Sequence, residues 1–107
     1  MFTVIKNPTF RTTATINVPT DDGIVAQTLS VRFRIGADDD DVGEGVGVPF
    51  LRSVILSLDD MVGEDQVPLP YSEALRDQLL ARPFVRTGLL RAYFDALSGA
   101  KAATRGN

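Results

Sequence analysis

Two segments near the start of the chain alternate apolar and polar side chains with a period of two. This period is typical of strands that have one buried face and one solvated face. Between the segments, residues 19–23 read Pro-Thr-Asp-Asp-Gly, and an Asp-Gly pair offers the positive φ that a hairpin turn needs. We therefore predict an antiparallel β-hairpin over residues 8–35. The side chains expected on its buried face are Phe10, Thr12, Ala14, Ile16 and Val18, then Val25, Gln27, Leu29, Val31, Phe33 and Ile35.

A lone hairpin is only marginally stable in water, so its apolar face must pack on something else. The chain has 107 residues, of which 44% are hydrophobic. A chain of this size and composition is expected to form one domain with its own core. The predicted fold class is α+β: residues 1–107 form a single domain in which the N-terminal hairpin packs on about three helices from a helical part at residues 48–99.

Residues 36–47 combine four glycines with five acidic residues, which predicts a flexible, acidic connector. Alternating Asp residues followed by Gly also suggest a calcium loop. Such a loop needs a bidentate Glu at its twelfth position, and counting from Asp38 or Asp39 places Pro49 or Phe50 there. We therefore favour the solvated connector over the calcium site.

At the C-terminal end of the chain, residues 100–107 are small and polar and predict a frayed tail.

A short amphipathic helix is expected after the connector. Pro49 suits the first helical position, and five apolar residues at positions 50, 51, 54, 55 and 58 share one face. The β-branched pair Val54-Ile55 leaves a strand open as an alternative. Residues 59–70 contain acids, Gly and two prolines, which predict an irregular loop.

Two more helices are expected in the C-terminal third. Ser72 is a good N-cap for a helix that runs to about Ala81. Pro83 ends that helix and can start the next, which gives a tight corner between the two. The last helix should run to about Leu97, because Ser98-Gly99 is a natural stop.

The chain is poor in residues that do chemistry. It has no His and no Cys, which excludes Ser-His-Asp and Cys-His catalysis, disulfides and His- or Cys-based zinc sites. The glycines of residues 43–47 are followed by no Lys-Ser/Thr pair, so no phosphate loop is expected. Two carboxylate pairs remain, Asp59 with Asp60 and Glu64 with Asp65, and solvated loop acids are the ordinary interpretation of both. We expect a protein that is not an enzyme and has no cofactor and no metal.

Charge and hydropathy argue against nucleic acid and the membrane as partners. The formal net charge is −3 and the 11 basic residues are scattered, which disfavours nucleic acid. No apolar run approaches the roughly 18 residues that span a bilayer. Residues 1–10 also lack a basic segment followed by an apolar run, so no export signal is expected. The sequence thus predicts a soluble, intracellular protein.

The last predicted helix carries more apolar surface than one small core needs. At 100° per residue its apolar side chains span an arc of about 200°, whereas about 100° suffices for a helix on a core. The arc contains Val85, Leu89, Leu90, Ala92, Tyr93, Phe94, Ala96 and Leu97, and the other side contains Phe84, Thr87, Gly88, Arg91 and Asp95. Either the same chain buries this arc, or one edge binds a partner or another subunit. The candidate partner or self-association residues are Leu90, Tyr93, Phe94 and Leu97.

Several characteristic segments occur in a fixed order along the chain. They are Lys6-Asn7-Pro8-Thr9-Phe10, Phe50-Leu51-Arg52-Ser53-Val54-Ile55, Asp59-Asp60-Met61-Val62, Gly63-Glu64-Asp65, Pro68-Leu69-Pro70-Tyr71-Ser72, Leu79-Leu80, Pro83-Phe84-Val85-Arg86, and the run from Leu90-Arg91-Ala92-Tyr93 through Phe94-Asp95-Ala96-Leu97 to Ser98-Gly99-Ala100. In this order they resemble the tail assembly chaperones of long-tailed bacteriophages and prophages. The chain differs by its Gly-rich connector, where members usually have a longer acidic helix, and by Leu58-Asp59-Asp60, where they have Trp-Asp-Gly.

The resemblance implies a non-enzymatic assembly role. Such a protein binds the long, helical tape measure protein and keeps it soluble in the host cytoplasm until the tail tube forms, and it is absent from the mature virion. A homo-oligomer and a longer frameshifted form of the same protein are further partners that the family implies. Arg105-Gly106-Asn107 can be encoded as CGG GGA AAC, which contains the slippery heptamer G GGA AAC, and a coding sequence without such a heptamer would remove that hypothesis.

Two other classes stay open. One is a structural virion protein of the tail, such as a tube, terminator or adaptor subunit, whose hairpin joins a neighbour's sheet. The other is an unrelated regulatory or adaptor domain of a mobile element. Gene order tests the chaperone prediction against these two classes, because a chaperone gene is expected immediately upstream of a very long, helix-rich gene.

Overall fold

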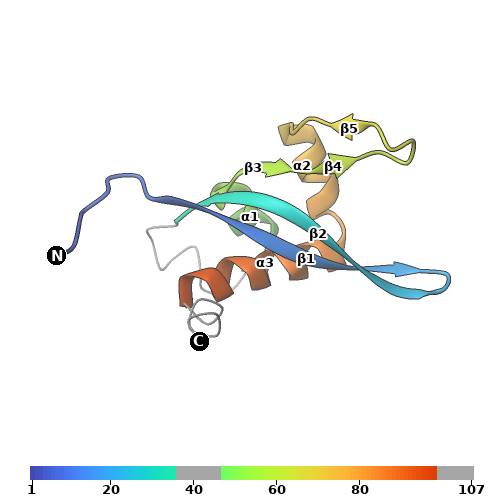
Figure 1. The fold of residues 1–107 in the computed structure, drawn as a ribbon, viewed down its shortest axis with the longest axis horizontal. Coiled ribbons are helices and arrows are strands. Elements are labelled where there is room, and N and C mark those ends of the chain that lie inside the picture. The colour runs from blue at the N-terminus through green and yellow to red at the C-terminus, as the bar shows by residue number, and fades with distance from the viewer. Residues whose placement is uncertain (36–46, 99–107) are drawn as a thin grey trace.

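The computed structural model describes residues 1–35 and 47–98. The predicted acidic connector, apart from Gly47, the alternative calcium loop and the predicted frayed tail lie outside the described residues. In chain order the elements are β1 (Thr9–Thr20), β2 (Gly23–Arg34), α1 (Val48–Val54), β3 (Ile55–Asp59), β4 (Met61–Val62), β5 (Pro68–Leu69), α2 (Glu73–Leu80) and α3 (Pro83–Ser98) (Figure 1). The predicted α+β class, with an N-terminal antiparallel hairpin followed by three helices, is confirmed.

The hairpin forms in the register that the alternating pattern implies. β1 and β2 pair antiparallel along their whole length, from Thr9 opposite Arg34 to Thr20 opposite Gly23. Residues directly opposite one another share a face, so the two predicted inward sets meet on the same side of the sheet. At the turn Gly23 takes φ +117°, and the Thr20 hydroxyl donates to the Gly23 carbonyl oxygen at 2.6 Å. The predicted role of glycine in this turn is therefore confirmed.

The helix predicted over the apolar positions 50–58 is wrong beyond Val54. The chain leaves α1 at Ile55, which has extended φ and ψ of −79° and 119°, and continues as β3. β3 pairs antiparallel with β2, with Leu58 opposite Val31, and gives a three-stranded sheet of order β1-β2-β3. Two causes favour the strand: branched side chains suit a pleated surface, and the edge of β2 offers backbone groups that need partners.

The predicted irregular loop at 59–70 contains a second, very short hairpin. β4 pairs antiparallel with β5, and the Gly63 amide donates to the Val67 carbonyl at 2.9 Å across the turn. Asp60 and Gln66 take φ of +63° and +67°, a region that polar side chains tolerate better than branched ones. Because each strand has only two residues, Pro68 occurs at a strand end, where its missing amide matters least.

The two C-terminal helices begin and end close to where the sequence predicts. The Ser72 hydroxyl accepts a hydrogen bond of 3.1 Å from the Leu75 amide, so the predicted N-cap is confirmed. α2 ends at Leu80, and α3 begins at Pro83 after a short corner. α3 extends to Ser98, one residue beyond the predicted end.

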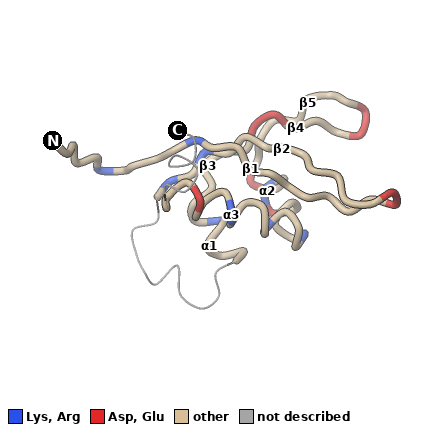
Figure 2. The backbone as a smooth tube through the Cα atoms, turned by 60° about the horizontal axis from the view of Figure 1, so that its bottom comes forward, with Lys and Arg blue, Asp and Glu red and all other residues tan. Residues whose placement is uncertain are grey.

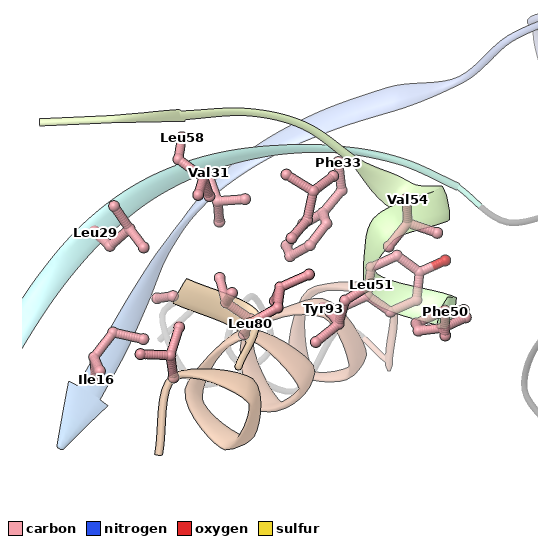
Figure 3. Close-up of a cluster of buried hydrophobic side chains, with 14 residues drawn as sticks. Ile16, Leu29, Val31, Phe33, Phe50, Leu51, Val54, Leu58, Leu80 and Tyr93 are labelled. Carbon is pink, nitrogen blue, oxygen red and sulfur yellow. The ribbon is translucent and has the colours of Figure 1, made fainter. Parts of the chain in front are cut away.

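The core lies between one face of the sheet and the helices (Figure 3). α3 runs along β1, while α1 and α2 contact each other and α3. Gly88 allows the close approach: a Cβ there would lie 2.6 Å from the Thr15 carbonyl oxygen. The sequence placed Gly88 on the polar side of the helix, and the structure buries it against β1 because only a residue without a side chain fits there.

Two parts of the chain project from opposite ends of the molecule (Figure 1). One is the segment of residues 1–7, called here the arm, which precedes β1 and has no helix or strand. The other is the tip of the β1-β2 hairpin. Within the described residues, no helix is long and apolar enough to cross a membrane.

Candidate functional site

The structure divides the predicted partner residues of α3 between core and surface. Tyr93 is 3% exposed, and its ring centroid lies 5.1 Å from those of both Phe33 and Phe50 in edge-on contacts. It therefore lies in the core, whereas the sequence grouped it with the candidate partner residues. Aromatic rings at these distances and angles stabilise each other beyond the effect of burial alone.

The remaining three residues form an edge on α3, which we call the α3 edge: Leu90, Phe94 and Leu97. Leu90 is partly buried against the core, whereas Phe94 and Leu97 are 37% and 44% exposed. The Phe94 ring stacks on Phe50 of α1, with centroids 5.9 Å apart and planes within 5° of parallel. α1 thus covers one side of the α3 edge and leaves the other side to solvent. The helix has more apolar surface than this part of the chain buries.

A second apolar feature, which the sequence did not reveal, lies at the opposite end of α3. It is a groove of about 390 Å³ between the outer part of the hairpin, the β4-β5 hairpin, α2 and the start of α3. Ten of its lining residues are apolar: Ile16, Val18, Leu29, Met61, Val62, Leu69, Leu75, Leu79, Phe84 and Val85. The polar ones are Gln27, Thr28, Asp60 and Arg82. The groove is therefore suited to an apolar ligand rather than to chemistry at a polar centre.

One wall of the groove is a strand edge. β3 pairs with β2 only from Ser30 to Phe33, and no described strand pairs with this edge of β2 closer to the tip. We call residues 23–28 of β2 the open half and residues 29–34 the closed half. In the open half Ile24 and Val25 are 73% and 46% exposed, while Val31 and Phe33 in the closed half are fully buried. An unpaired edge next to an apolar groove is a site where an extended chain can bind.

The groove end of the molecule is acidic. Figure 2 shows acidic residues at the tips of both hairpins. They are Asp21 and Asp22 in the first turn and Glu64 and Asp65 in the second. Asp60 and Arg82 are the two charged residues among those that line the groove. A segment that binds here would be favoured by apolar side chains together with a basic residue nearby.

One member of each carboxylate pair of the sequence has a structural partner. Asp59 Oδ2 accepts from Arg11 Nη1 at 2.7 Å, which links β3 to β1 across the sheet. Asp65 Oδ1 accepts from the Val67 amide at 3.1 Å within the β4-β5 turn. Over residues 1–35 and 47–98, no group of three or more acidic side chains is placed to hold a metal ion.

A charged contact also ties α1 to α2. Asp77 Oδ1 accepts from Arg76 Nε at 3.0 Å and from Arg52 Nε at 3.2 Å. The hydrogen bond from Arg76 lowers the pKa of the Asp77 carboxyl, and the positive charges of Arg76 and Arg52 lower it further. This contact lies away from the groove, so its role is to hold the helices together.

Sequence patterns indicate one wall of the groove, the β4-β5 hairpin, but they do not show that a groove forms. Met61-Val62 and Val67-Pro68-Leu69 are two short apolar runs around an acidic turn, which is a weak hairpin pattern. Nothing in the sequence shows that β3 stops short of the hairpin tip, and this is what creates the open edge.

We found no match to this chain among the models of known protein families, the curated proteins or the solved structures.

Proposed function

We propose that this protein is a tail assembly chaperone of a long-tailed phage or prophage that binds the tape measure protein without catalysing a reaction. The observation that carries the proposal is the α3 edge, where Leu90, Phe94 and Leu97 extend an apolar row from the core to the surface. Their spacing of i, i+4 and i+7 matches the way a helix presents anchors to an amphipathic helix of a partner. The sequence resemblance supplies the identity of that partner.

The composition of the α3 edge suits a client that must be released. Phe94 and Leu97 are half-exposed rather than fully exposed, so the free protein tolerates them in water. Phe94 is already oriented by stacking on Phe50, which lowers the entropic cost of binding. A small, preorganised apolar edge can bind helices of a long client along their length. Tube subunits can then replace the bound chaperone on the client.

The test is co-expression with the tape measure protein from the same locus. In Phe94→Asp/Leu97→Asp, two charges replace the exposed anchors, and we expect client binding to weaken on the order of 30-fold or more. The soluble fraction of the client should fall accordingly. Ala74→Asp/Gln78→Asp is the matched control, because it adds the same charge at two exposed positions of α2.

Circular dichroism and a melting curve establish that both double variants fold. A folded Phe94→Asp/Leu97→Asp variant that keeps the tape measure protein soluble as well as the wild type does would contradict the proposed client surface. If the α2 control also fails to bind the client, the added negative charge, and not the α3 edge, accounts for the lost binding.

A structural virion protein of the tail is the second candidate, and the open half of β2 favours it. An unpaired edge can join a neighbour's sheet and build a ring of subunits. Mass spectrometry of purified virions distinguishes the two. The chaperone should be present in cells that assemble tails and absent from particles, whereas a structural subunit should be present in particles at a fixed copy number.

A further inference from the structure

We propose that the open half of β2 and the adjoining groove bind the arm (residues 1–7) of a second copy of this chain. The arm would lie along the strand edge as an added strand and place its apolar side chains in the groove. This inference concerns self-association, and it depends on neither of the functions proposed above.

The groove requires an extended ligand. In an antiparallel pair, alternate residues of a strand direct their N–H and C=O groups away from their partner strand. Such groups in the open half face the side where β3 has ended. An added strand satisfies them, and its alternate side chains point into the apolar groove next to Leu29 and Val62. A helix would leave these edge groups unpaired.

The arm has the matching properties. Phe2, Val4 and Ile5 are 87%, 84% and 63% exposed, which is unusual for three apolar side chains in one short segment. Phe2 and Val4 are two residues apart, so in an extended chain they point to the same side. The arm has no helix or strand of its own, and Pro8, whose carbonyl accepts from the Ile35 amide at 3.1 Å, fixes its base to β2.

The arm cannot fill the groove of its own chain. Thr9 is paired with Arg34, and the open half begins six residues further along β2, at Thr28. A strand rises about 3.3 Å per residue, so the open half lies between about 20 Å and about 36 Å from Arg34 along β2. Phe2 reaches at most about 23 Å from Thr9, so it could reach only the first residues of the open half. β3 also occupies the intervening edge. Figure 1 shows the arm leaving the body at the end opposite the β1-β2 tip and the β4-β5 hairpin, and β4-β5 borders the groove.

Charge favours the same pairing. The arm contains one charged side chain, Lys6, and the groove end has acids in both turns (Figure 2). A bound arm would bring Lys6 toward this acidic end, which steers association and opposes a reversed orientation. Because arm and groove lie at opposite ends, each copy can donate one arm and accept another. Such a head-to-tail contact builds open chains or closes into a ring.

Sedimentation of the purified chain, without any client, tests the inference. An arm of a few residues buries less than the about 1,600 Å² of a standard interface, so we expect a dissociation constant between about 10 µM and 1 mM. The wild type should shift from monomer to larger species over that range. Phe2→Asp/Val4→Asp should weaken association on the order of 30-fold or more, and these positions lie outside the core, so the fold is preserved.

Val62→Asp/Leu69→Asp tests the other side of the contact, since both side chains line the groove and are half-exposed. Leu56→Asp is the control, because Leu56 is an equally exposed residue of β3 outside the groove. We expect the groove variant to stay monomeric and the control to associate like the wild type. Each variant's fold is checked by its core methyl NMR signals.

Mixing the arm variant with the groove variant is the decisive measurement. One junction remains, between the intact arm of the groove variant and the intact groove of the arm variant. The mixture should therefore form 1:1 heterodimers, with amide shift changes confined to the open half of the arm variant. A wild type that stays monomeric up to about 1 mM, or an arm variant that associates like the wild type, would overturn the inference. Failure here leaves the client test untouched, because that test measures a different surface with a different partner.

Discussion

The two halves of β2 have the same alternating pattern but opposite surroundings. In the closed half, β3 pairs with the strand edge, and the helices cover its apolar face, so Val31 and Phe33 are fully buried. In the open half, Val25 on the same face is 46% exposed, and the edge is unpaired among the described strands. The difference teaches that alternation predicts a strand and its faces, while neighbouring elements decide whether an apolar face becomes core or binding surface.

The largest expected effect tests this difference directly. Phe33→Ala in the closed half should lower the free energy of unfolding by about 3–5 kcal/mol, because it removes a buried ring and leaves a cavity. Val25→Ala in the open half, on the same face as Phe33, should lower it by less than about 1 kcal/mol, because Val25 is half-exposed. Urea denaturation of both variants measures the two values. Similar losses would mean that the open half is part of the core, contrary to the structure.

An intermediate effect is expected at Gly88, where α3 lies on β1 opposite the open half. Gly88→Ala places a Cβ against the Thr15 carbonyl, and the backbone must move. Overpacking costs about 1–3 kcal/mol, and the better helix propensity of Ala returns up to about 1 kcal/mol, so a net loss of about 1–2 kcal/mol is expected. Arg91→Ala, at an exposed position of the same helix, is the control and should be nearly neutral.

Unchanged stability in Gly88→Ala would show that α3 can move away from β1 at little cost. In that case the packing of α3 on the outer part of the hairpin would contribute little to stability. The outer part of β1 would then differ from its inner part in the same way as the two halves of β2 do.

The smallest expected effect compares a charge that links two helices with a charge at the hairpin tip. Asp77 links α1 to α2 and has a lowered pKa in the folded state, chiefly through its hydrogen bond from Arg76. A lowered folded-state pKa stabilises the fold above the unfolded value of 3.8, and this contribution is lost as the pH falls through the folded value. Asp77→Asn should therefore lower the Tm slightly at neutral pH and leave it unchanged in strongly acidic solution.

Asp22→Asn at the hairpin tip removes the same charge from the open end and serves as the matched control. Thermal melts over a pH series compare the two variants. Since exposed ion pairs contribute little, the difference should be small but specific to Asp77. Equal pH profiles for both variants would show that net charge, and not the link between α1 and α2, accounts for the effect.

Local patterns predicted the elements whose causes are local. Period-two alternation located the β1-β2 hairpin, Ser72 located the start of α2, and Pro83 located the start of α3. The prediction of a helix over positions 50–58 was wrong after Val54, because pairing with β2 outweighed the helical spacing of the apolar residues. Tyr93 was grouped with the candidate partner residues because a helical wheel does not show its contacts with the rings of Phe33 and Phe50.

The sequence by itself determined the strand faces, the turn at Gly23, the helix ends at Ser72 and Pro83, and the absence of His and Cys chemistry, because each depends on residue type and near neighbours. Only the tertiary structure decided which apolar residues stay exposed. β3 ends at Asp59, so it leaves half of β2 unpaired and opens the groove, while α1 covers Tyr93 and not Leu97. Those outcomes depend on where segments far apart in the chain begin and end against one another, and no local pattern encodes that.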